Sequence, residues 1–225
     1  MKKLQMLSLA LILSLCLSIP AFAWTADDVN WDEVEVTMEE PTSTPDNTPS
    51  DWAKSEVDKA IAAGLVPVLT GNPGYQDTIT REQFAELVVY MAEKIQGGEL
   101  DAAGSAFNDS SNPAVLKAYA AGIVAGVGDN RFDPNAKTNR EQIATMIARA
   151  ISYLEVRKGK DITPLESDIS KFTDKAQVSD WATEAMGTLA VNGIMAGTSA
   201  TTLSPKSPCT VEQSILLLYR AFEKF

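Results

Sequence analysis

The sequence predicts an all-α protein, built from three helix–loop–helix repeats that form one domain around a central helical bundle. Three observations predict this fold: apolar residues recur at helical spacing, strand signals are weak throughout, and one pattern of helix, loop and helix occurs three times. Neither helix of a unit can bury its apolar stripe alone, so we expect the units to pool their apolar faces with pseudo-threefold character.

Residues 1–23 are typical of a secretory signal peptide. Two lysines precede an apolar run over residues 4–19, and Ala-Phe-Ala at 21–23 provides a small-x-small cleavage site. Acidic, proline-containing sequence follows, which favours cleavage over a retained membrane anchor. We therefore expect a secreted chain with no membrane attachment after cleavage.

The charge of the chain is strongly acidic. It has 19 basic and 30 acidic residues, and removal of the two signal-peptide lysines leaves 17 basic residues and a formal charge of −13. Nucleic acid and anionic lipid surfaces are poor partners for such a protein. Any binding of an anionic polymer must depend on local sites, because long-range electrostatics would oppose it.

The amino-acid composition also excludes several classes of catalytic and metal site. The absence of histidine removes Ser-His-Asp and Cys-His nucleophile systems and His-ligated zinc. Cleavage leaves Cys209 as the one cysteine, which excludes an internal disulfide, and its place in the repeat predicts a small buried hydrophobe. No spacing selects a calcium loop or a carboxylate pair, so we predict no metal, no cofactor and no catalytic residues. A glycan hydrolase is a distant alternative.

Residues 24–50 form an acidic segment that becomes rich in Pro, Thr and Ser, which is typical of an extended linker. Two readings stay open for it. It is a tether without a role of its own, or it recruits a second protein, which would make the chain an adaptor.

The three predicted repeats span residues 51–106, 107–169 and 170–225. The first helix of each is Ala-rich and amphipathic and ends at a glycine, followed by a loop of turn-forming residues. In the first repeat we expect Val57, Ala60 and Ile61 on the buried face. The helix-ending glycines are Gly64, Gly122 and Gly193.

The second helix of each repeat begins with a capping-box sequence, which reads TREQ at 80–83, NREQ at 139–142 and TVEQ at 210–213. The cap predicts a helix but leaves one feature unexplained. Arg81 and Arg140 put a cation at the positive end of the helix dipole, which is unfavourable for arginine alone and favourable for arginine with a bound anion. The third repeat has Val211 there.

Together these motifs resemble the S-layer homology repeat. The similarity rests on F-x-D at 107–109 and 172–174, D-W-A at 51–53 and 180–182, the G-x-G-D-N-x-F-x-P loop at 126–134, and T-R-E-Q in place of I-T-R-A-E. The resemblance covers about residues 51–225. It implies a non-catalytic protein of the bacterial cell wall or S-layer, whose grooves bind an anionic cell-wall polysaccharide, typically one with pyruvate ketals, without a covalent bond.

The resemblance also implies ligand-binding residues, with departures in two repeats. The third repeat lacks the arginine, the second reads Asp109-Ser110-Ser111 at the D-W-A position, and the motif glutamate is a glutamine throughout. We therefore expect unequal grooves, with the third the weakest. The expected ligand-binding residues are Arg81, Arg140, Trp52, Trp181, Asp51, Asp180, Gly71 and Gly126.

Each of these residues has a structural alternative. A guanidinium binds a ligand carboxylate in a bidentate way, or it pairs with a neighbouring acid such as Asp77 or Glu141. The tryptophans stack on a sugar ring or anchor the helix in the core. For Gly71, Gly126 and Gly197 we favour turns with positive φ over close approach of a sugar.

Overall fold

The computed structural model describes residues 47–225. The predicted signal peptide and residues 24–46 lie outside the described residues, so both readings of the acidic segment stay predictions. Across residues 47–225 the chain is all-α, as predicted, and this part contains no strand. Its helices and one 3-10 turn are α1 (Asp51–Ala62), α2 (Arg81–Gln96), α3 (Pro113–Ala120), α4 (Arg140–Lys158), η2 (Lys175–Gln177), α5 (Asp180–Val191) and α6 (Val211–Phe222).

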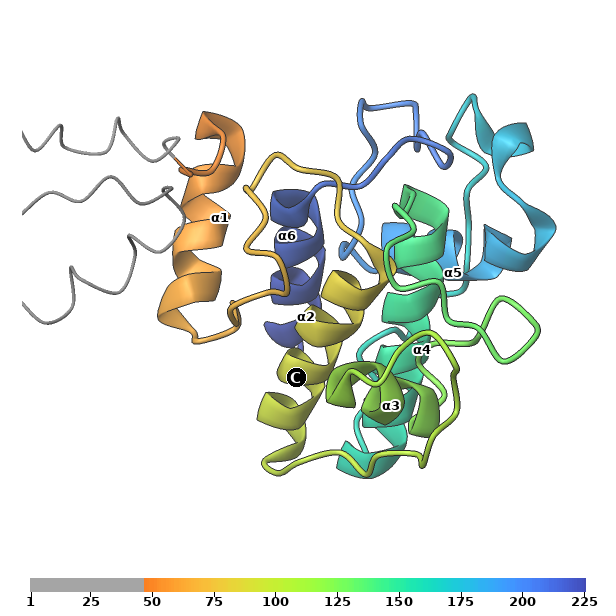
Figure 1. Ribbon diagram of the computed structural model, residues 1–225. Coiled ribbons are helices and arrows are strands. Elements are labelled where there is room, and N and C mark those ends of the chain that lie inside the picture. The colour runs from red at the N-terminus through yellow and green to blue at the C-terminus, as the bar shows by residue number, and fades with distance from the viewer. Residues whose placement is uncertain (1–46) are drawn as a thin grey trace, which may run out of the picture. The chain divides into compact units, whose positions relative to one another are not determined.

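The second helices of the repeats, α2, α4 and α6, contact one another at the centre of this body (Figure 1). The first helices lie outside them. Each outer helix packs on the inner helix of the preceding repeat, which pairs α3 with α2, α5 with α4 and, closing the cycle, α1 with α6. The core is therefore shared among the repeats, as the amphipathic stripes predict.

The buried stripe of α1 shows how this packing arises from the sequence. Ala53, Val57 and Ala60 recur at helical spacing and are fully buried. Ile61, which we expected on the same face, is 47% exposed, because the next position along a helix turns about 100° away from the stripe. Small residues in the stripe let α1 approach α6 closely.

All three predicted capping boxes form. The side chains of Thr80, Asn139 and Thr210 accept hydrogen bonds from the backbone N–H of the glutamine three residues on, at 3.2, 3.0 and 3.3 Å. The glutamine side chains reach back to the cap N–H groups. Each cap stabilises the fold by about 1 kcal/mol.

A ring of backbone hydrogen bonds joins the segments that lie just before these three caps. The N–H of Ile79 donates to the Cys209 carbonyl, that of Thr138 to Ile79, and that of Cys209 to Thr138, at 3.0, 3.1 and 3.1 Å. All three residues are buried. Burial raises the pKa of the Cys209 thiol, and the predicted buried position of this cysteine is confirmed.

The first N–H groups of each inner helix donate hydrogen bonds to a loop of the following predicted repeat. We call each of these contacts a junction and name it by the first residue of the helix. The Arg81, Arg140 and Val211 junctions have the same backbone geometry. The junctions connect the three inner helices in a closed cycle. Pseudo-threefold symmetry stays a prediction. The N–H groups of Arg81, Arg140 and Val211 donate to Ala136, Ser207 and Asp77 at 3.0, 3.1 and 3.0 Å.

The end of the predicted linker is part of this folded body. Asn47 Oδ1 accepts a hydrogen bond from the Tyr75 N–H at 3.0 Å, and the Thr48 carbonyl accepts one from Gln76 at 3.2 Å. The predicted linker boundary at residue 50 therefore lies a few residues beyond the point where these contacts begin.

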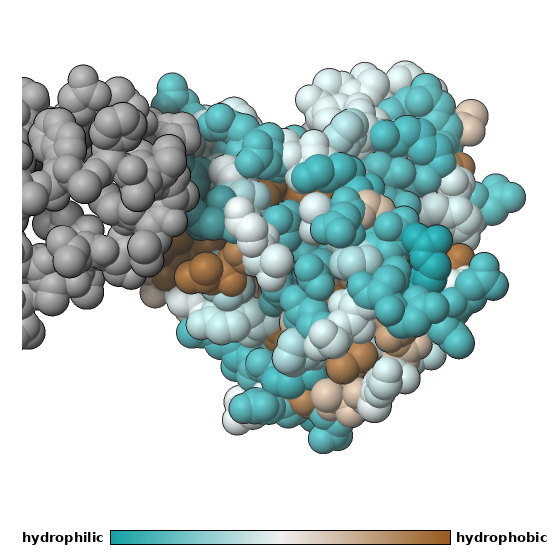
Figure 2. All heavy atoms as spheres, viewed as in Figure 1, coloured by the Kyte–Doolittle hydropathy of each residue, from teal (hydrophilic) through white to brown (hydrophobic). Residues whose placement is uncertain are grey.

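The face of the body shown in Figure 2 is mainly hydrophilic, with small separate apolar patches. Of the helices between residues 47 and 225, none combines the length and the apolar character that crossing a membrane requires.

Candidate functional site

The two junction arginines hold loops of the following repeat. Arg81 donates through Nε to the Phe132 carbonyl at 2.9 Å and through Nη2 to the Ala125 carbonyl at 2.8 Å. The Arg81 guanidinium also lies over the Phe132 ring, 4.6 Å from its centroid. Arg81 thus ties the first repeat to the second.

Arg140 makes the equivalent contacts with the third repeat. It donates to the Leu203 carbonyl at 2.9 Å and to the Ala196 carbonyl at 2.8 Å. Within residues 47–225 neither arginine forms an ion pair with a carboxylate, so the predicted alternative of pairing with Asp77 or Glu141 is wrong. The reason is geometric, since the rigid guanidinium fork spans two carbonyls of the facing loop.

The electrostatics of both arginines fit an anion-binding role. Burial lowers the pKa of the Arg81 and Arg140 guanidinium groups, which nevertheless stay charged at neutral pH. Arg140 is only 6% exposed. A desolvated cation with carbonyl partners but no carboxylate keeps a desolvation cost that a bound anion would offset.

Arg140 and Trp52 lie in one hollow of about 420 Å³, which we call the Trp52 hollow. Trp52 is 61% exposed, so the alternative of a core anchor is wrong for this residue. Three repeats contribute to the wall of the hollow. Its lining residues are Trp52 of α1, Arg140 of α4, Ala196, Gly197 and Thr198 of the third loop, and Gln213, Leu216, Leu217 and Arg220 of α6.

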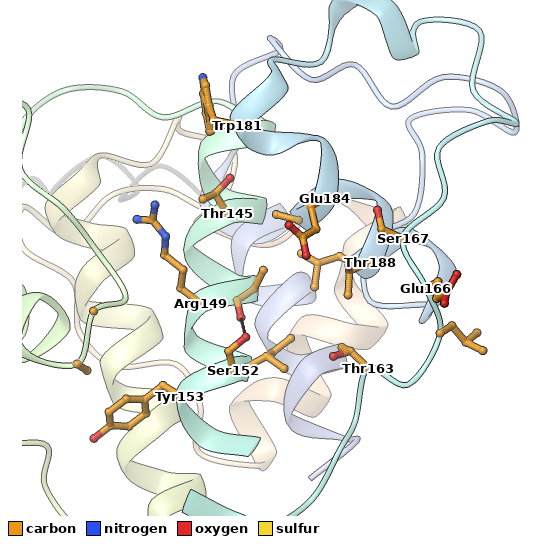
Figure 3. A pocket seen from close by; sticks show the side chains of 17 residues that line it. Thr145, Arg149, Ser152, Tyr153, Thr163, Glu166, Ser167, Trp181, Glu184 and Thr188 are labelled. Atoms are coloured by element: carbon orange, nitrogen blue, oxygen red, sulfur yellow. Dashed lines mark hydrogen bonds between the residues drawn. The ribbon is translucent and has the colours of Figure 1, made fainter. Parts of the chain in front are cut away.

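A larger hollow of about 860 Å³ lies between α4, α5 and the connector before η2; we call it the Trp181 hollow (Figure 3). Trp181 is 57% exposed, so it is not a core anchor either. Arg81 does not line this hollow, and the structure does not bring Arg81 and Trp181 together as it does Arg140 and Trp52. The polar and aromatic residues of its wall are Thr145, Arg149, Ser152, Tyr153, Thr163, Glu166, Ser167, Trp181, Glu184 and Thr188.

The Val211 junction lacks these features. Ala114 of α3 takes the place of the tryptophan, and Glu86 of α2 takes the place that Leu216 has in the Trp52 hollow. The Glu86 carboxylate accepts hydrogen bonds from the Thr70 N–H at 2.9 Å and from Asn112 Nδ2 at 2.7 Å. A fixed carboxylate without a nearby arginine disfavours an anionic ligand here.

The second repeat requires a correction to the predicted D-W-A alignment. Helix α3 begins at Pro113 with Asn112 as its N-cap, because proline fits the first helical position. The residues equivalent to 51–53 are therefore 113–115, not 109–111. Asp109 instead accepts hydrogen bonds from the N–H groups of Phe132 and Asp133 at 2.8 and 2.9 Å, and the Phe132 bond is the main reason why its pKa is lowered.

The loop glycines differ in their roles. Gly71 has φ +77°, as expected for a turn, but lines neither hollow. A Cβ on Gly126 would lie 2.8 Å from the Arg131 carbonyl oxygen, and one on Gly197 would lie 2.4 Å from that of Ser199. Neither Gly126 nor Gly197 has a positive φ, so close packing against backbone, and not turn geometry, requires glycine there.

Asp51 and Asp180 are the exposed first residues of α1 and α5. A carboxylate in the first helical turn is favourable next to the positive end of the helix dipole. Neither aspartate lines a hollow, so nothing in the geometry distinguishes them from helix-end residues.

The sequence analysis missed a set of buried glutamates. Glu212 accepts hydrogen bonds from both the N–H and the hydroxyl of Ser50, each at 2.9 Å, and Glu141 makes the same pair of contacts with Ser179 at 3.0 and 3.2 Å. These serines precede α1 and α5, so the glutamates fix the helix ends that carry Trp52 and Trp181. The signal was present, because a glutamate occupies the second helical position in all three capping sequences.

The described fold and its hollows define an all-α protein in which α2, α4 and α6 are joined cyclically, each to the loop that precedes the next of these helices. Residues 108–144 and 171–212 match the S-layer homology domain. These segments lie within the predicted second and third repeats and support the family resemblance. The assignment of residues 51–106 as a first repeat, and the boundaries between repeats, stay predictions.

Three relatives illustrate the similarity. The chain is 27% identical over 180 residues to an exoglucanase, XynX, of Acetivibrio thermocellus, 33% over 141 residues to an endoglucanase of a Bacillus species, and 25% over 181 residues to a surface-layer 125 kDa protein of Lysinibacillus sphaericus. The matches cover 77%, 61% and 79% of this chain but only 16%, 14% and 14% of the relatives. The similarity therefore concerns one part of much longer proteins.

The S-layer homology domain is a binding and anchoring module. Together with the similarity to a surface-layer protein, this locates the chain, a secreted protein, at the cell surface or cell wall.

Proposed function

We propose that this protein is a non-catalytic module that binds an anionic cell-wall polysaccharide of bacteria without a covalent bond. The observation that carries the proposal is the Trp52 hollow. It combines a buried arginine, Arg140, which has no carboxylate partner between residues 47 and 225, with an exposed tryptophan. A guanidinium binds a carboxylate, and an indole ring stacks on the apolar face of a sugar.

The ligand most consistent with this hollow is a sugar carrying a carboxylate, such as a pyruvate ketal. A pyruvate ketal is joined to the sugar through two oxygens and carries its carboxylate on the ketal carbon beside the sugar ring, so one sugar can contact the arginine and the tryptophan together. A protein with excess negative charge repels an anionic polymer at long range, and the local cation is then required for binding.

We further propose that two regions bind, namely the Trp52 hollow at the Arg140 junction and the Trp181 hollow. The Val211 junction has Val211, Glu86 and Ala114 at the corresponding places and does not take part. This ranks the third site lowest, in agreement with the expectation from the motif.

The experiment that tests the proposal is co-sedimentation of the purified secreted chain with isolated wall sacculi, before and after chemical extraction of the non-peptidoglycan polymer. We expect the chain to sediment with intact sacculi and to stay in solution after extraction. Trp52→Ala/Trp181→Ala is the matched variant, because both side chains are exposed and their loss leaves the core intact. Sedimentation that survives extraction would mean that the polymer is not the ligand.

A further inference from the structure

We propose, on the basis of the proposed function, that the Trp181 hollow binds a longer stretch of the polysaccharide than the Trp52 hollow does. In this hollow Arg149 contacts an anionic substituent of the glycan. The Trp52 hollow, in contrast, takes a shorter stretch and contacts its anion through Arg140. The two hollows then differ in the length of polysaccharide that they bind and in the arginine that contacts its anionic substituent.

Two equivalent arginines differ in their ion pairing. Arg149 of α4 and Arg220 of α6 occupy the same place in their repeats. Arg220 binds Glu56 of α1 in a bidentate ion pair, with Nε at 3.1 Å and Nη2 at 2.5 Å from the carboxylate oxygens. Its charge is therefore neutralised within the protein.

Arg149 has no such partner. Ala185 of α5 occupies the place that Glu56 has in α1, and across residues 47–225 no carboxylate lies within ion-pair distance of Arg149. The side chain is exposed and lines the hollow. It is thus available to an anionic group of a ligand.

The Trp181 hollow is long and is lined with hydroxyl groups. Its wall follows α4 from Thr145 to Ser152, about 10 Å along the helix axis at a rise of 1.5 Å per residue. The connector adds Thr163 and Ser167 on the other side. A long wall of hydroxyl groups next to an exposed tryptophan suits a chain of several sugar rings.

Opposite charges are separated within the Trp181 hollow. In Figure 3 the Arg149 guanidinium points away from Glu184 and Glu166, which lie on the side of α5 and the connector. Carboxylates accept hydrogen bonds from neutral sugar hydroxyls and repel a second anion. The anionic substituent is therefore directed toward Arg149, with neutral rings along the rest of the hollow.

The test uses the full secreted chain carrying Trp52→Ala, which disables the Trp52 hollow and leaves the Trp181 hollow. The probe is polysaccharide purified from wall sacculi, separated by size, and compared with the same fractions after carbodiimide amidation of their carboxylates. We expect Arg149→Gln to weaken binding of the native fractions about tenfold, the loss of one charge-assisted contact, and to change binding of the amidated fractions less than about twofold. Lys158→Gln is the control, because it removes the same charge from α4 outside the hollow.

Fragment length provides a second readout. The affinity of Trp52→Ala is expected to rise with fragment length over a wider range than that of Trp181→Ala, which keeps the shorter hollow. If Arg149→Gln binds native fractions within twofold of its parent, or if both tryptophan variants respond equally to length, the inference is wrong. If the chain without substitutions does not bind the polysaccharide at all, the proposed function itself is wrong.

Discussion

The Arg140 and Val211 junctions have the same backbone and different side chains. At both, a capped helix donates its first N–H groups to a loop of the next repeat, with distances of 2.8 to 3.1 Å. Arg140 adds two hydrogen bonds to carbonyls of the loop and faces a hollow with Trp52, whereas Val211 adds none, and Glu86 has the repeat position that Leu216 has in that hollow. Cap and amide contacts are therefore sufficient to form a junction.

The difference assigns two roles to the arginine. It reinforces one junction that could form without it, and it presents a partly desolvated cation to a hollow. The family resemblance implies a ligand contact for these arginines, and their loop contacts also contribute to stability. Substitutions at the two junctions can separate these roles.

The largest effect is expected for Arg140→Ala. It removes two charge-assisted hydrogen bonds and leaves the carbonyls of Leu203 and Ala196 without this donor, so the free energy of unfolding should fall by about 3 kcal/mol, and polysaccharide binding should fall with it. Arg140→Lys should recover only part of the loss, since an ammonium does not span two carbonyls. Chemical denaturation measures the first effect. A change below about 0.5 kcal/mol would show that the arginine does not reinforce the junction.

The next effect concerns the glutamate after the junction residue. Glu141 is 2% exposed and bound to Ser179 and Lys206, so Glu141→Ala should destabilise the protein by about 2 kcal/mol. Glu82, the matched residue of the Arg81 junction, makes a single long contact to Ser110 at 3.3 Å, and Glu82→Ala should cost about 0.5 kcal/mol or less. Thermal melts of the two variants compare them directly. Equal costs would mean that the serine contacts of Glu141 contribute nothing.

A smaller stability effect and a clear binding effect are expected for Trp52→Ala. The side chain is exposed, so stability should change by no more than about 0.5 kcal/mol, while the affinity of the Trp52 hollow should fall about tenfold or more and leave the Trp181 hollow as the remaining site. Calorimetric titration alongside a melt measures both. Ile61→Ala, another exposed apolar residue of α1 outside the hollow, is the control and should leave affinity unchanged. The opposite pattern, lost stability with full affinity, would make Trp52 a packing residue.

The smallest effect is expected for Val211→Arg. The capping box at Thr210 stays in place, so the fold should tolerate the substitution, and affinity should stay within about twofold because Glu86 keeps anions out. Glu86→Thr combined with Val211→Arg reproduces Thr145 and Arg81, which have the corresponding repeat positions at the Arg81 junction. A gain of affinity from Val211→Arg alone would show that Glu86 does not close this junction.

The sequence predicted the local structure well and the contacts between repeats poorly. Capping boxes and buried stripes depend on residues a few positions apart, and Thr80, Asn139 and Thr210 are caps as expected. The acceptors of Arg81 lie in the following predicted repeat, and the serine partner of Glu212, Ser50, lies just before the first one, so no local spacing encodes these contacts. The D-W-A alignment of the second repeat was wrong because its first helix begins at Pro113. Residues 113–115 are Pro-Ala-Val and match the motif at no position.

Calorimetric titration of the secreted chain with short, carboxylate-bearing polysaccharide fragments tests the central claim most directly. We predict two binding sites per chain, of which Trp52→Ala removes one, Trp181→Ala removes the other, and the double variant retains none, with all variants folded in thermal melts. Three equivalent sites, or full binding by the folded double variant, would contradict the assignment of the two tryptophan hollows as the binding sites.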